Sequence, residues 1–133
     1  MELPGLPPRA HVEIGTRAEL AGARTRTHLP DGRVLGLVGP AEGLAGWVVD
    51  AELDVDPPQA LARRFGTDDF WERWTRAECA AKLAGVPVQR WLGRHGLTDP
   101  DRLGFALSTV RAESGSLVLS TGRARHRAFT RLP

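Results

Sequence analysis

The stretch Trp74-Thr-Arg-Ala-Glu-Cys-Ala-Ala-Lys82 decides the fold, because it lies inside a helical pattern that runs from Thr67 to Ala84. Apolar residues recur at the spacing of one helix face, and the predicted buried stripe consists of Phe70, Trp74, Ala77, Ala81 and Ala84. Glu78 and Lys82, the only lysine of the chain, are four residues apart and so are neighbours on an adjacent face. We expect one face to pack and the other to carry chemistry.

Capping signals define this helix and its neighbours. Thr67 is the predicted N-cap, Asp68 and Asp69 would occupy the first turn, and Gly85 would end the helix. Shorter helices are predicted before and after it, at Gln59–Phe65 and Val86–His95.

The rest of the chain has β patterns. Asp31-Gly32 is a tight-turn dipeptide between two β-favouring runs and predicts a hairpin. Further strands are expected at 10–14, 47–53, 103–112 and 116–121, with a third C-terminal strand at 125–132. The sequence therefore predicts one α+β domain, residues 1–133, in which an antiparallel sheet packs against a long central helix after an irregular N-terminus, residues 1–8.

Composition limits the class of protein. With 41% hydrophobic and 26% charged residues, the 133-residue chain resembles an ordinary globular domain. The uncharged runs are too short to span a membrane and the first residues lack a secretory pattern, so we expect a cytoplasmic protein without membrane association. The single cysteine, Cys79, argues against an internal disulfide or a thiolate zinc site and is expected to pack in the core.

Basic residues gather at the C-terminus. Residues 122–133 contain four arginines and one histidine without an acid, which predicts a basic strand or tail. Such a segment could contact nucleic acid or an acidic protein, or be a solvated edge strand. We disfavour nucleic acid because the sequence has no recognised binding motif.

Three carboxylates form the candidate site. Asp50 and Glu52 are two residues apart on a predicted strand and would share one face, and Glu78 lies on the helix that follows. Mg²⁺ binds one or two carboxylates together with substrate phosphate, and Lys82 could place a positive charge on that phosphate. Surface ion pairing is the alternative interpretation of the same spacing.

Three motifs in order resemble the 4′-phosphopantetheinyl transferase superfamily. They are Thr25-Arg-Thr-His28, Trp47-Val-Val-Asp-Ala-Glu52 and the stretch 74–82, and the resemblance extends from Thr25 to Gly85. It implies a fold like one half of a larger phosphopantetheinyl transferase. It also implies transfer of 4′-phosphopantetheine from coenzyme A to a serine of an acyl or peptidyl carrier protein.

The resemblance assigns roles to the candidate residues. Asp50, Glu52 and Glu78 would bind Mg²⁺, and Glu78 would also deprotonate the serine. Lys82 would contact phosphate as a catalytic and coenzyme A-binding residue, and His28 would contact a coenzyme A phosphate.

Two departures leave a second function open. Ala77 stands where the family has a phosphate-contacting lysine, and Arg76 would point about 100° away around the helix. The chain is also short, and the family's smaller members complete their sites by forming trimers, so a homo-oligomer is expected. The alternative is a catalytically impaired member that binds carrier protein or coenzyme A in polyketide or peptide biosynthesis without transferring the arm.

Overall fold

The computed structural model describes residues 1 and 3–125. Their helices and strands follow in the order β1 (His11–Gly15), β2 (Thr25–His28), β3 (Val34–Val38), α1 (Ala41–Leu44), β4 (Val48–Leu53), α2 (Gln59–Phe65), α3 (Phe70–Ala84), α4 (Val88–His95), η1 (Pro100–Leu103), β5 (Phe105–Ala112), η2 (Glu113–Gly115) and β6 (Leu117–Ala124), where η marks a 3-10 helix. The α+β class is confirmed, with the central helix followed by α4 as predicted.

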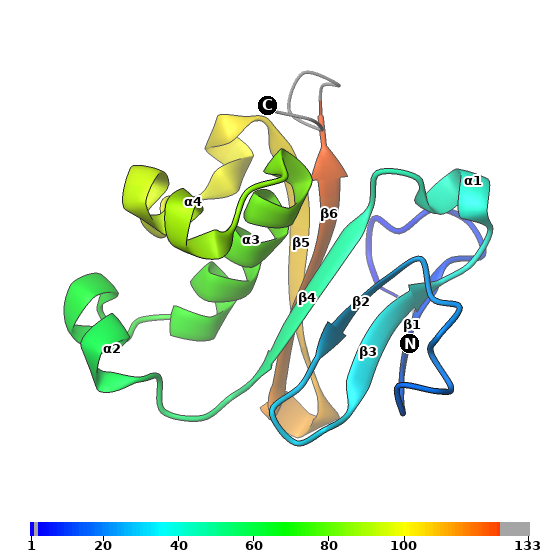
Figure 1. Cartoon of the computed structure of the whole chain (residues 1–133), viewed down its shortest axis with the longest axis horizontal. Helices are drawn as coiled ribbons and strands as arrows, with labels where there is room; N and C mark the ends of the chain where they lie inside the picture. The colour runs from blue at the N-terminus through cyan, green and yellow to red at the C-terminus, as the bar shows by residue number, and fades with distance from the viewer. Residues whose placement is uncertain (2, 126–133) are drawn as a thin grey trace.

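The strands form two antiparallel sheets instead of the single sheet that was predicted. Three strands are ordered β4-β6-β5 and the other three β1-β3-β2. Helix α3 packs on the sheet β4-β6-β5. Strand β4 lies between α3 and the strands β2 and β3 of the second sheet (Figure 1). Side chains alternate along β4, so Val49 and Ala51 face the core shared with the second sheet, whereas Asp50 faces α3.

The predicted hairpin is confirmed. Strands β2 and β3 pair antiparallel, with His28 opposite Val34. Gly32 has φ +92°, a conformation that glycine adopts without steric cost, and the Asp31 carboxylate accepts a hydrogen bond from the Arg33 backbone N–H at 3.1 Å. The Asp-Gly dipeptide therefore forms the turn.

The central helix ends as predicted but begins later. Gly85 adopts a left-handed conformation at φ 71° and stops the helix. The prediction of Thr67 as N-cap is wrong, because Asp69 occupies the N-cap position and no side chain caps the helix. The Arg73 guanidinium donates to backbone carbonyl groups of the preceding loop, those of Phe65, Gly66 and Asp68, and so holds that loop outside the helix.

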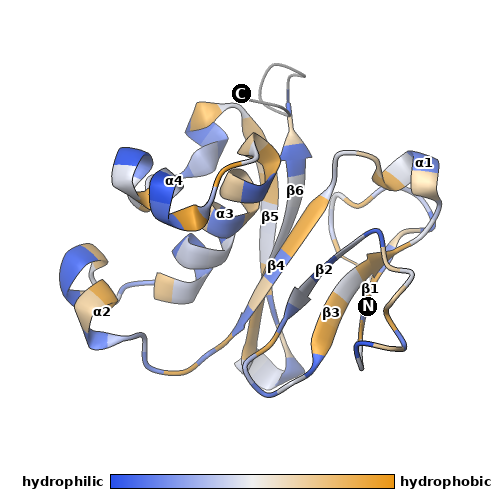
Figure 2. Ribbon diagram, viewed as in Figure 1, coloured by the Kyte–Doolittle hydropathy of each residue, from blue (hydrophilic) through white to orange (hydrophobic). Residues whose placement is uncertain are grey.

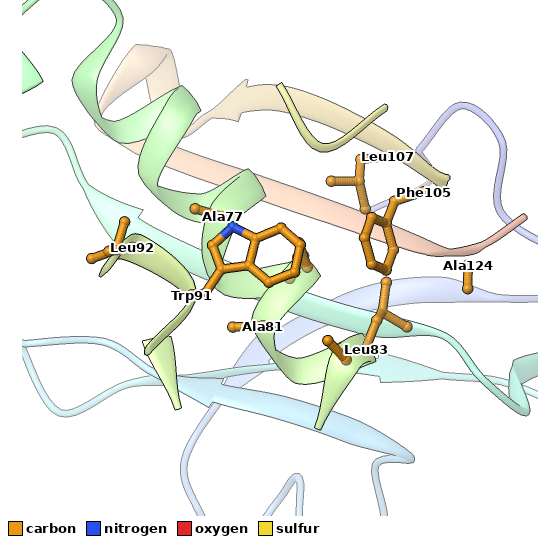
Figure 3. Close-up of a cluster of buried hydrophobic side chains, with 11 residues drawn as sticks. Ala77, Ala81, Leu83, Trp91, Leu92, Phe105, Leu107 and Ala124 are labelled. Carbon is orange, nitrogen blue, oxygen red and sulfur yellow. The ribbon is translucent and has the colours of Figure 1, made fainter. Parts of the chain in front are cut away.

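Helix α3 is buried on two faces. The predicted stripe is confirmed, with Trp74 half-buried and its other members buried. Ala77 and Ala81 lie beside Trp91 of α4 in the cluster shown in Figure 3, which also contains Phe105. Thr75 and Cys79 are buried on the face toward β6. Figure 2 shows strongly apolar segments on β3 and β4, which contribute to the core between the two sheets.

The ends of the chain fit the prediction in part. Among described residues 1 and 3–8 there is no helix or strand, as expected. Residues 122–124 complete β6, whereas most of the strand predicted at 125–132 lies outside the described residues. Helix α1 was not predicted. Within the part of the chain that the structure describes, no helix combines the length and apolar character needed to cross a bilayer.

Candidate functional site

The candidate residues meet where β4 faces α3. Asp50 and Glu52 pair in register with Ser120 and Val118 of β6, and both residues of β4 are on the face toward the helix. Glu78 and Lys82 come from successive turns of α3. The predicted grouping of the strand carboxylates with the helix acid-base pair is therefore present in the fold.

Asp50 is the buried centre of this group. It is 4% exposed, and its Oδ1 accepts hydrogen bonds from Lys82 Nζ at 3.3 Å and from Thr27 Oγ1 at 3.2 Å. Lys82 Nζ also donates to the Val49 backbone carbonyl at 2.8 Å, and the Lys82 side chain is 33% exposed. Asp50 Oδ2 is buried and has no hydrogen-bond partner among the described residues.

Burial and mutual repulsion change the acidity of the carboxyls. Burial raises the pKa of Asp50 to about 7; Lys82 opposes this increase, whereas Glu78 and Glu52 add to it. Burial also raises the pKa of Glu52, with a further contribution from Glu78. Burial raises the pKa of Glu78, and the positive charge of Lys82 offsets part of that increase. The three carboxyls and one ammonium therefore form a single electrostatic cluster.

A chain of three hydroxyl groups centres on Ser120 of β6, beside the cluster. Ser120, which is opposite Asp50, has its Oγ 2.8 Å from both Thr75 Oγ1 and Thr109 Oγ1. The Cys79 thiol donates to the Ser120 carbonyl at 3.4 Å, and burial raises the pKa of this thiol well above its usual value. Cys79 is thus a packing residue, as predicted.

Two residues next to the cluster, Thr27 and Ser120, were not predicted from the sequence. Thr27 belongs to the Thr25–His28 motif, so a signal for it existed. Ser120 had no such signal, because its role depends on the pairing of β4 with β6.

Arg76 and Ala77 do not belong to the cluster. Arg76 donates to Thr109 Oγ1 at 3.0 Å and forms ion pairs with Asp99 and Asp101, each at 3.0 Å. Ala77 is fully buried beside Trp91. Arg76 therefore does not replace the lysine of the family motif, and position 77 faces the core.

The His28 side chain makes no hydrogen bond or ion pair with the three carboxylates in the described part of the chain. It is exposed at the end of β2, and its side chain makes no hydrogen bond or ion pair with any described residue. Because neighbouring strand residues point to opposite faces, His28 points away from the side on which Thr27 meets Asp50.

The carboxylates supply oxygen donors of the kind that a hard cation needs, but they do not form a complete site. Across residues 1 and 3–125, no group of three or more His, Cys, Asp or Glu side chains is arranged so that it could hold a metal ion. Mg²⁺ takes one or two carboxylates and completes its shell with water and phosphate. Asp50 Oδ2, which lacks a donor among the described residues, and the repulsion among the carboxyls both favour a cation here.

No protein-family model matches the chain, and no curated protein or solved structure matches it either.

Proposed function

We propose that this protein transfers 4′-phosphopantetheine from coenzyme A to a serine of an acyl or peptidyl carrier protein, with Mg²⁺ as cofactor. One observation carries the proposal. The buried Asp50 accepts a hydrogen bond from Lys82, the only lysine of the chain, and interacts electrostatically with Glu52 and Glu78. All four residues occupy their positions in the motifs that resemble the transferase superfamily.

Each residue has a role in this reaction. Asp50, Glu52 and Glu78 would hold Mg²⁺, with one or two of them as direct ligands because no three-ligand group is formed among the described residues. The ion would supply positive charge to the diphosphate of coenzyme A. Lys82, partly exposed beside Asp50, would donate to a phosphate oxygen. His28 would bind a coenzyme A phosphate from the end of β2, where its imidazole is accessible.

The chemistry requires one proton acceptor. The serine Oγ forms a bond to the phosphorus that carries pantetheine, the bond from that phosphorus to the nucleotide breaks, and adenosine 3′,5′-bisphosphate leaves. Glu78 would accept the serine proton, directly or through water. Its raised pKa supports this role, since a base is most effective when its pKa is nearer the working pH.

The proposal includes the setting of the reaction. The chain resembles one half of a larger transferase, so a second copy would complete the coenzyme A site in a homo-oligomer. The carrier protein would belong to a cytoplasmic polyketide or peptide biosynthesis system.

A second function is favoured by position 77. The family's lysine is replaced by Ala77, which is fully buried, so this chain lacks one phosphate-contacting cation. An impaired member would keep the fold and bind coenzyme A or carrier protein without transferring the arm.

The test uses intact-mass spectrometry of apo carrier proteins mixed with the full chain, coenzyme A and Mg²⁺. We expect a carrier to gain one phosphopantetheine arm, the gain to disappear in Glu78→Gln, and the gain to persist in Glu42→Gln, which changes an exposed glutamate on α1. Coenzyme A binding without a mass gain on any carrier would support the impaired member instead.

A further inference from the structure

We propose that the cavity between α4 and η1 binds a small amphipathic anion, an apolar chain or ring that carries one carboxylate or phosphate group. The cavity is lined by Trp91, Arg94, His95, Arg102, Leu103 and Phe105. It shares no lining residue with the candidate transferase site, so this inference is independent of the proposed function.

The size and wall of the cavity fit a small organic molecule. Its volume is about 620 Å³, within the range of roughly 300–1,000 Å³ that is usual for small-molecule sites. The rings of Trp91 and Phe105 meet edge to face at 5.7 Å, and the partly buried Leu103 packs against the same cluster (Figure 3 shows the two rings). Trp91 and Phe105 are 5% and 1% exposed, so they form the buried floor beneath the cavity, and the half-buried Leu103 is the apolar side chain that reaches its surface.

The rim of the cavity is positively charged. Arg94 and Arg102 are both exposed, and neither guanidinium has a hydrogen-bonded or ion-paired partner in the described part of the chain. The pKa of Asp99 is lowered mainly by its hydrogen bond from Arg76 and less by the charge of Arg102, and the Asp99 carboxylate is ion-paired with Arg76. Two guanidinium groups without partners beside an apolar wall favour an anionic group on the ligand.

The end of α4 makes the apolar body necessary. Its last carbonyl groups lie near His95, and the negative end of the helix dipole disfavours a bare anion. The ligand must therefore gain affinity from the wall as well as from the arginines.

Two side chains of the cavity lining can report occupancy through changes in their surroundings. The Trp91 indole N–H is buried and has no acceptor among the described residues. The His95 ring lies 4.2 Å from the Trp91 ring, and both burial and the nearby Arg94 lower the pKa of His95. An anion beside Arg94 would offset that positive charge and raise the pKa of His95.

The experiment is an NMR titration of the full chain with four probes, followed at the Trp91 indole N–H and the His95 ring. Trp91→Phe assigns the indole signal. Octanoate and octyl phosphate carry both required parts, acetate has no apolar body, and 1-octanol has no charge. We expect octanoate or octyl phosphate to bind at least about tenfold more tightly than 1-octanol, and acetate to cause no saturable shift. Whichever of octanoate and octyl phosphate binds more tightly identifies the preferred head group.

Charge variants identify the rim. The double variant Arg94→Gln and Arg102→Gln should weaken binding of the acid probes by about tenfold or more and leave 1-octanol unchanged. Arg63→Gln removes an exposed arginine of α2 that does not line the cavity and should have no effect. Equal binding of octanoate, octyl phosphate and 1-octanol, no binding of either acid, or unchanged acid binding in the double variant would overturn the proposal.

Discussion

Replacing Asp50 by Asn should remove a pH dependence from the stability of the protein. The pKa of Asp50 is about 7 in the folded state, whereas an unfolded aspartate has a pKa of about 4. Between those values the folded protein holds a proton that the unfolded chain has lost. The free energy of unfolding therefore falls as the pH rises through this range, and the loss is complete above the folded pKa.

The magnitude follows from the size of the shift. Each pH unit inside the range changes the free energy of unfolding by about 1.4 kcal/mol, so wild type should lose about 3 kcal/mol more than Asp50→Asn between about pH 5 and pH 8. Glu52 and Glu78 also have raised pKa values and contribute a loss of the same sign, but they remain in the variant. The difference between the two proteins therefore reports the titration of Asp50 together with its coupling to the other two carboxyls.

The assay is urea unfolding at both pH values, followed by tryptophan fluorescence in the presence of EDTA. Asp31→Asn is the matched control, because the pKa of Asp31 is lowered by its hydrogen bond from Arg33 and the group does not titrate in this range. The reasoning is refuted if Asp50→Asn loses as much stability as wild type between the two pH values.

Three further changes test the surrounding structure. Ala77→Lys would place a charge in the core and should lower the free energy of unfolding in urea by about 3 kcal/mol or more; an unchanged midpoint would contradict the burial of position 77. Thr75→Val removes a hydroxyl partner of Ser120 and should cost about 1 kcal/mol in the same assay, with Thr75→Ser costing less; equal losses would argue against the hydroxyl chain. Millimolar Mg²⁺ at about pH 8 should raise the thermal midpoint of wild type but not that of Asp50→Asn, and equal shifts would place the cation elsewhere.

Local signals predicted most elements of the fold. Gln59–Phe65 matches α2, Gly85 and Gly96 end α3 and α4, and Asp31-Gly32 forms the β2–β3 turn. These features depend on backbone conformations that a few neighbouring residues determine, so they can be identified from sequence. The start of α3 could not, because Arg73 fixes the preceding loop through contacts with three carbonyl groups.

Long-range pairing explains what the sequence did not predict. The division into two sheets and the position of Ser120 opposite Asp50 depend on β4 pairing with β6, which is about half the chain away. The shared face of Asp50 and Glu52 was predicted because strand alternation is local. The bond from Lys82 to Asp50 was not, since it depends on how α3 lies across β4.

Release of adenosine 3′,5′-bisphosphate from coenzyme A tests the proposed transfer most directly. With an accepted apo carrier and Mg²⁺, wild type should release one nucleotide for each arm added to the carrier, and Glu78→Gln should release none above background. Intact coenzyme A after incubation with every carrier tested, or release that continues unchanged in Glu78→Gln, would contradict the proposed chemistry at this site.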